Sequence, residues 1–112
     1  MKLAEVYSSI QGEGHWVGVR QIFVRFPHCN IICAYCDEDD LPFREWTVDE
    51  VLQQVGIFLQ GAPHHSVSFT GGEPCLYAHH IEILAPRIAL PVFLETNGTL
   101  PAPAGIDWIC VS

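Results

Sequence analysis

Three cysteines lie close together near the start of the chain. Cys29, Cys33 and Cys36 fall within eight residues and are followed at once by the acidic run Asp37–Asp40. Thiolates at such spacing bind zinc or an iron–sulfur cluster. Zinc would take a fourth ligand such as His28, whereas a four-iron cluster on three thiolates keeps one iron open to a substrate or cofactor. The spacing therefore predicts a metal site, with chemistry at the metal if that metal is iron.

Strands alternating with helices are expected to position this loop. Period-two patterns predict strands over 3–8, 21–26, 66–70, 91–96 and 106–111. Thr47–Glu50 reads as a capping box that opens a helix, and a second helix is predicted over 76–90, weakened by Pro86. This order indicates parallel β/α units in a single α/β domain over 1–112.

The unusual motifs all follow predicted strands. The cysteine loop comes after 21–26, the sequence TGGEP after 66–70, and ETNG at the end of 91–96. Parallel strands end at one edge of their sheet, where β/α barrels and open α/β sheets place their active sites. We expect these three segments to meet at that edge.

Alternation along two of the strands separates an apolar face from a partly polar one. Residues two apart share a face, so the polar set is Gln21, Phe23, Arg25, Ser66, Ser68 and Thr70, opposed to Ile22, Val24, Phe26, Val67 and Phe69. The polar face could simply meet water. Parallel sheets, however, are usually covered on both faces, so a curved sheet whose polar face lines a cavity is the favoured prediction.

Composition excludes some classes of partner. Thirteen acidic against five basic residues give a formal charge of −8, and Lys2 is the only lysine, so no basic stripe could neutralise a nucleic-acid backbone. No apolar run reaches the length of a membrane span, and the first residues lack the apolar centre of a signal peptide. A cytoplasmic protein is expected, with neither nucleic acid nor a membrane as direct partner, and with reduced thiols that bind metal rather than form disulfides.

The motifs resemble those of a known superfamily. Cys29-x3-Cys33-x2-Cys36 resembles the cluster motif of radical S-adenosylmethionine (SAM) enzymes, and TGGEP resembles their glycine-rich SAM-binding motif. Within that superfamily the whole chain is similar to the 7-carboxy-7-deazaguanine synthase family, through SIQGEG (9–14), FVRF (23–26), CNIICAYCD (29–37), LETNGT (94–99) and VS (111–112). The resemblance implies the amino-terminal portion of a parallel β/α barrel of the radical SAM type, truncated after about four barrel strands.

The resemblance also implies cofactors and an activity. Cys29, Cys33 and Cys36 would hold a [4Fe-4S] cluster whose open iron binds SAM, and a flavodoxin- or ferredoxin-type partner would supply the electron that yields a 5′-deoxyadenosyl radical. The family contracts the ring of 6-carboxy-5,6,7,8-tetrahydropterin to 7-carboxy-7-deazaguanine with loss of ammonia, in queuosine and 7-deazapurine biosynthesis. The residues expected to contact SAM are Gly71, Gly72, Glu73, Glu95, Thr96 and Asn97, with Glu73 accepting from the SAM ammonium.

Substrate contacts are expected on the polar face and in the glycine turn. Arg25 would clamp the pterin carboxylate, because a buried guanidinium needs an anionic partner; Glu13 or another internal acid is the alternative partner. Gln11, Glu13 and Gly14 would read the pterin edge, although Gln11 or Glu13 could instead cap the turn. Glu38 stands where the family often has a hydroxyl that reaches Mg²⁺, and is predicted as a magnesium ligand rather than as part of a solvated acidic loop.

Other readings remain at this point. A radical SAM activase of a glycyl-radical enzyme or of an anaerobic ribonucleotide reductase shares the cysteine spacing, and a non-catalytic zinc or iron–sulfur module needs no further motif; metal analysis separates the last from the enzymes. Cys75 and Cys110 are expected to be packing thiols. The strand at 106–111 would expose an unpaired edge, so an oligomer such as a homodimer is expected.

Overall fold

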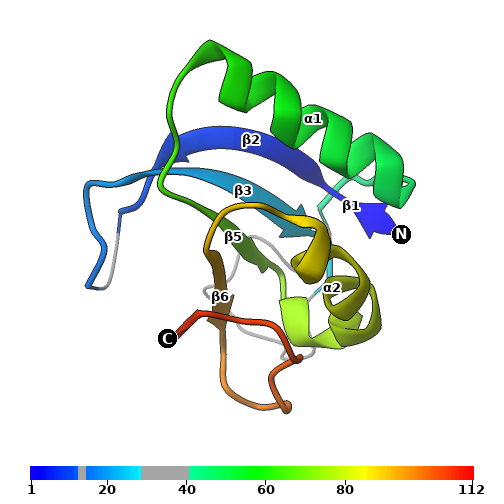
Figure 1. Ribbon diagram of the computed structural model, residues 1–112. Helices are drawn as coiled ribbons and strands as arrows, with labels where there is room; N and C mark the ends of the chain where they lie inside the picture. The colour runs from blue at the N-terminus through cyan, green and yellow to red at the C-terminus, as the bar shows by residue number, and fades with distance from the viewer. Residues whose placement is uncertain (13–14, 29–40) are drawn as a thin grey trace.

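The structure, a computed structural model, describes residues 1–12, 15–28 and 41–112 (Figure 1). In these ranges one sheet has the strand order β2-β3-β5-β6-β7. Its strands are β2 (Glu5–Ile10), β3 (Arg20–Phe26), β5 (Ser66–Gly71), β6 (Val92–Thr96) and β7 (Trp108–Val111). The last four run parallel, as predicted, whereas β2 lies antiparallel to β3. A short antiparallel pair, β1 (Lys2–Leu3) with β4 (Arg44–Glu45), lies beside it.

The first helix begins where its capping box predicts. Helix α1 spans Val48–Gly61, and Thr47 is its N-cap. The Thr47 hydroxyl accepts from the backbone N–H of Glu50 at 3.1 Å, and the Glu50 carboxylate accepts from the N–H of Thr47 at 2.9 Å. These reciprocal bonds satisfy two donors that a helix start leaves unpaired. Val51 and Val55 then turn toward the sheet and are buried.

The second predicted helix is shorter than expected. Instead of a continuous helix over 76–90, the chain forms a 3₁₀ turn η1 (Pro74–Tyr77), helix α2 (Ala78–Leu84) and a second 3₁₀ turn η2 (Ala85–Arg87). Pro86 lies in η2, and a proline cannot donate the backbone hydrogen bond that an α-helix interior requires. No helix described here is long and apolar enough to cross a membrane.

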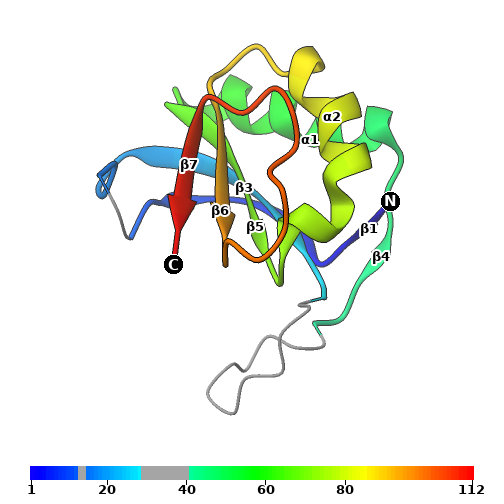
Figure 2. The same ribbon diagram turned by 90° about the horizontal axis from the view of Figure 1, so that it is seen from below.

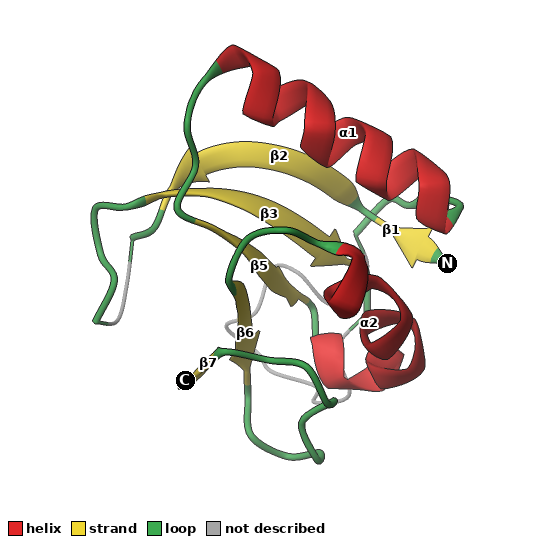
Figure 3. Cartoon of the chain, in the orientation of Figure 1, coloured by secondary structure: helices red, strands yellow, loops and turns green. Residues whose placement is uncertain are grey.

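The connection from β6 to β7 has no helix in residues 97–107 (Figure 3). Its return to the sheet is secured at Asp107, whose N–H donates to the Val92 carbonyl at 2.8 Å and whose carboxylate accepts from the Val92 N–H at 2.7 Å. A loop alone therefore makes this parallel crossover.

Both helices cover the same face of the sheet (Figure 2). The core between them is formed by strand residues Ile22, Val24, Phe69 and Leu94 and helix residues Val51, Ile81 and Leu84, all fully buried. The opposite face carries Gln21, Ser66 and Ser68, which are also fully buried. The predicted alternation of the two faces is confirmed, and the polar face is enclosed rather than wet.

Candidate functional site

A cavity of about 620 Å³ opens where the parallel strands end. A volume of this size is within the usual range for a small-molecule or cofactor site. Residues predicted as cofactor or substrate contacts line it together: Gln11, Arg25, Gly71, Gly72, Glu95, Thr96 and Asn97. The predicted meeting of TGGEP with ETNG is confirmed, and Gln11 and Arg25 from two other segments of the chain lie beside them. The third predicted segment, the cysteine loop, lies outside the described residues.

Three further residues line the cavity, Tyr7, Phe23 and Thr70, and of these the sequence alone does not predict Tyr7. Phe23 and Thr70 belong to the polar-face set that period two assigns to the cavity side. Tyr7 is brought opposite Phe23 by the β2–β3 register, and their rings stack at 5.2 Å. Only the pairing of β2 with β3 reveals this aromatic wall, because no local pattern states which residues of two strands face each other.

The glycines of TGGEP are packed against the segment that leads to the cysteines. The N–H of Gly72 donates to the Phe26 carbonyl at 3.1 Å, and the N–H of Glu73 donates to the His28 carbonyl at 2.7 Å. A Cβ on Gly71, whose φ is +154°, would lie 2.5 Å from the Phe26 oxygen, and one on Gly72 would lie 2.1 Å from the His28 oxygen. Close backbone packing thus requires both glycines, and it ties this loop to the residue directly before Cys29.

Glu73 connects two of the loops at the cavity. Its carboxylate is fully buried and accepts hydrogen bonds from the Cys75 N–H, the Thr96 hydroxyl and the Asn97 N–H, each at 2.8 Å. Glu73 does not appear among the residues that line the cavity. The structure therefore gives this carboxylate a role inside the protein, holding TGGEP to ETNG, and its predicted contact with the SAM ammonium stays a prediction.

Arg25 lies in the cavity wall with partners from β2. Its Nη2 donates to the Tyr7 hydroxyl at 2.6 Å, and its Nε lies 3.6 Å from the Glu5 carboxylate. The Glu5 side chain is 55% exposed, so it is not the internal acid of the alternative interpretation. Glu13 lies outside the described residues. The Arg25 side chain keeps 20% of its surface exposed and is among the residues that line the cavity.

Gln11 and Glu95 meet inside the cavity wall. The amide nitrogen of Gln11 donates to a Glu95 carboxylate oxygen at 2.8 Å and to the Gln21 amide oxygen at 2.7 Å. The main chain of Gln11, through bonds with Val19 and Gly18, closes the neighbouring turn. Its side chain therefore belongs to the cavity, while its backbone serves the turn.

The predicted metal ligands lie outside the described residues. These are Cys29, Cys33, Cys36 and Glu38, and the predicted substrate contacts Glu13 and Gly14 are also outside. In 1–12, 15–28 and 41–112 no three His, Cys, Asp or Glu side chains gather into a metal site. The metal predictions rest on the sequence motif.

Known proteins match this chain over most of its length. It is 45% identical over 106 residues to the 7-carboxy-7-deazaguanine synthase of Methanothermobacter thermautotrophicus, covering 91% of this chain and 42% of that protein. It is 37% identical over 114 residues to the enzyme of the same name from Bacteroides thetaiotaomicron, covering 99% and 59%. The chain thus spans about half the length of these curated relatives.

A solved structure and a family model agree with these relatives. The crystal structure of QueE from Escherichia coli superposes with a TM-score of 0.79 at 26% identity, over 99% of this chain and 58% of QueE. The family model described as the Radical SAM superfamily matches residues 23–111, from β3 through the cysteine loop and the cavity segments to β7. The motifs, the fold and this match lead to one conclusion: the chain belongs to the radical SAM superfamily.

Proposed function

We propose that the protein catalyses a radical SAM ring contraction of the 7-carboxy-7-deazaguanine synthase type. Its substrate would be 6-carboxy-5,6,7,8-tetrahydropterin and its products 7-carboxy-7-deazaguanine and ammonia, in queuosine or 7-deazapurine biosynthesis. The observation that carries the proposal is the convergence of seven predicted contact residues on one cavity in a chain whose curated relatives bear that name.

The residues at the cavity suit the cofactors of the superfamily. SAM presents an ammonium, a ribose diol and an adenine amine, and the cavity offers the Glu95 carboxylate, the Asn97 side chain and the backbone of Gly71 and Gly72. The [4Fe-4S] cluster would be held by Cys29, Cys33 and Cys36, which follow directly on the His28 backbone tied to Gly72 and Glu73. When bound, cluster and SAM supply the radical chemistry that activates the substrate; the protein supplies orientation and exclusion of water.

The chain's own side chains would then orient the substrate. Arg25 would pair with the pterin carboxylate, and the stacked Tyr7 and Phe23 rings would offer an apolar wall beside it. A magnesium ion with Glu38 among its ligands is part of the proposal, as are a flavodoxin- or ferredoxin-type reductant, a homodimeric state and a cytoplasmic location.

The test of this function is turnover under anaerobic conditions. Protein reconstituted with iron and sulfide is incubated with SAM, a reductant, magnesium and 6-carboxy-5,6,7,8-tetrahydropterin, and 7-carboxy-7-deazaguanine is measured by mass spectrometry. We expect SAM-dependent product. Stoichiometric zinc without iron, or SAM cleavage that leaves the pterin intact, would exclude this function.

Replacing Arg25 separates recognition of the carboxylate from recognition of the ring. For Arg25→Met we expect the affinity for 6-carboxypterin to fall by about 10- to 100-fold, because a charge-assisted hydrogen bond contributes roughly 1.5–3 kcal/mol. Unsubstituted pterin, which has no carboxylate, should lose little affinity. Quenching of pterin fluorescence measures both constants.

Arg87→Met is the matched control. Arg87 is exposed, pairs with Asp49 at 3.4 Å and lies outside the cavity lining, so this variant should bind both pterins like the parent protein. Equal losses for both pterins in Arg25→Met would instead show that Arg25 maintains the shape of the site through Tyr7 and Glu5.

A further inference from the structure

Arg25 and Tyr7 form one polar group in the wall of the cavity. Both residues line the cavity, and Nη2 of Arg25 donates to the Tyr7 hydroxyl at 2.6 Å. The β2–β3 register places Glu5 directly opposite Arg25, so Tyr7, two residues farther along β2, reaches Arg25 diagonally on the same face. The Cζ atom of Arg25 lies 5.4 Å from the centre of the Tyr7 ring. A phenol and a guanidinium are therefore held side by side at the cavity.

The direction of this hydrogen bond leaves the phenol a hydrogen of its own. A guanidinium has only donors, so the Tyr7 oxygen is the acceptor and its O–H is not used by Arg25. Among residues 1–12, 15–28 and 41–112 the Tyr7 O–H donates to no acceptor. Hydrogen bonds in a chain polarise one another, so a hydroxyl that accepts from a cation is also a stronger donor. Tyr7 thus has one strong donor for a ligand.

The Tyr7 ring is fixed in place by its neighbour on β3. It stacks on Phe23, with ring centres 5.2 Å and planes 16° apart, and the Tyr7 side chain is half-buried. A hydroxyl on such a ring loses little conformational freedom when a ligand binds. Its distance of 2.6 Å from Nη2 of Arg25 is close to the separation of the two oxygens of a carboxylate. One carboxylate can therefore meet both groups.

We propose that the Tyr7 hydroxyl donates to the carboxylate that Arg25 binds, so that the two residues form a two-point clamp specific for a carboxylate. The inference rests on the proposed function and adds a donor to the part of the substrate that Arg25 would hold. Tyr7 is a specificity-determining residue in this assignment. Its ring belongs to the apolar wall of the cavity, and its hydroxyl selects ligands that carry an anionic oxygen beside that wall.

Tyr7→Phe tests the clamp, because phenylalanine keeps the ring and removes only the hydroxyl. Dissociation constants for 6-carboxypterin and unsubstituted pterin are measured by fluorescence quenching in the full chain reconstituted with its cluster, with SAM and magnesium held constant. We expect the affinity for 6-carboxypterin to fall by about tenfold, since a hydrogen bond to a charged group is lost. The affinity for pterin should change by less than about twofold, because pterin has no carboxylate.

A double-mutant cycle with Arg25→Met separates a direct contact from an effect through Arg25. If the hydroxyl itself donates to the ligand, Tyr7→Phe weakens 6-carboxypterin binding by about threefold or more in the Arg25→Met background as well. If Tyr7 only orients the guanidinium, its replacement has no further effect in that background, and the clamp is overturned. Arg25→Gln takes the place of Arg25→Met in the cycle should the double variant fail to unfold cooperatively.

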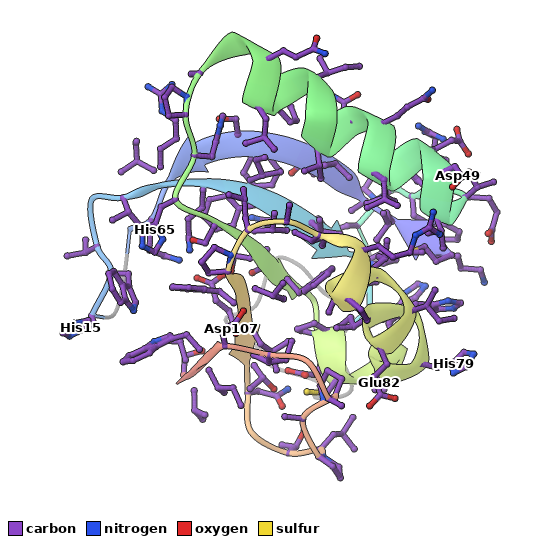
Figure 4. The ribbon with its side chains drawn as sticks, in the orientation of Figure 1. His15, Asp49, His65, His79, Glu82 and Asp107 are labelled. Atoms are coloured by element: carbon purple, nitrogen blue, oxygen red, sulfur yellow. The ribbon has the colours of Figure 1, made fainter. Side chains whose placement is uncertain are left out.

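Tyr77→Phe is the matched control. Tyr77 also stacks on a phenylalanine, Phe26, with ring centres 4.5 Å apart, but it does not line the cavity. It directly precedes α2, which the label of His79 marks in Figure 4 and which lies on the face of the sheet that the helices cover. The control makes the same chemical change away from the cavity, so it should bind both pterins like the parent protein.

The outcomes distinguish this inference from the function on which it rests. A preference for 6-carboxypterin that is unchanged in Tyr7→Phe overturns the clamp and leaves the proposed function standing. Equal losses for the two pterins in Tyr7→Phe also overturn the clamp, because they show that the phenol only maintains the shape of the wall. A parent protein that binds neither pterin overturns both the clamp and the proposed function.

Discussion

Alanine at any one of Cys29, Cys33 or Cys36 will abolish the iron–sulfur cluster, and alanine at Cys75 or Cys110 will leave it intact. Anaerobic reconstitution followed by iron and sulfide analysis, with the visible absorption of the cluster, measures this. We expect about four irons per chain in the parent protein, since three thiolates with one open iron match a four-iron cluster. A cluster that loses one of three protein ligands has no replacement within the motif.

The structure explains why Cys75 is not such a replacement. Its thiol is buried, and its Sγ lies 3.4 Å from the Thr96 hydroxyl. Burial, reinforced by the nearby Glu73 carboxylate, raises the pKa of Cys75 and so opposes the thiolate form that binds metal. Loss of iron in Cys75→Ala together with a cluster retained in Cys33→Ala would show that the ligands have been assigned wrongly.

Glu73→Ala is expected to cause the largest loss of stability among substitutions at the cavity loops. The change leaves three donors without their acceptor: the Cys75 N–H, the Thr96 hydroxyl and the Asn97 N–H. A buried donor without a partner costs about 1–3 kcal/mol, so we expect the free energy of unfolding to fall by at least about 3 kcal/mol. This is a large part of the roughly 5–15 kcal/mol typical of a folded domain. Urea unfolding followed by circular dichroism measures the change.

Two variants make the result specific. Glu73→Gln keeps one acceptor oxygen and should lose less stability than Glu73→Ala. Glu82→Ala removes a carboxylate that also accepts a backbone N–H, that of Ala104 at 2.8 Å, but at the exposed surface of α2, where water can replace it; its cost should be below about 1 kcal/mol. A Glu73→Ala protein as stable as Glu82→Ala would mean that Glu73 does not hold the two loops together.

Much of the fold and of the site could be predicted from local sequence patterns. The capping box at Thr47–Glu50 located the start of α1, because both of its hydrogen bonds form within four residues. Alternation placed Arg25 and Thr70 on one face and Val24 and Phe69 on the other, because a strand has no other period. Motif spacing identified the superfamily, since the order of the cysteine motif and the glycine-rich loop is a property of the chain itself.

Only the tertiary structure decided which residues far apart in the sequence form hydrogen bonds or pack against each other. The predicted contact of Glu73 with SAM stays a prediction, and only the fold shows that Glu73 accepts a hydrogen bond from Asn97, 24 residues along the chain. Gly71 and Gly72 stay predicted contacts of SAM, and only the fold shows that a side chain at either position would collide with the backbone of Phe26 or His28. Contacts of this kind depend on how closely two segments pack, and the local sequence of neither segment determines that distance.

The hydrogen bonds in the wall of the cavity also depend on the tertiary structure. Gln11 and Glu95 are 84 residues apart, and nothing in the sequence around either residue indicates that the Glu95 carboxylate accepts a hydrogen bond from the Gln11 amide. Gln21 and Ser66 could be placed on the polar face, but not paired with each other, before the parallel register of β3 and β5 was known. A hydrogen bond requires two groups within about 3 Å and in the right orientation, and for residues on different strands only the assembled sheet provides that geometry.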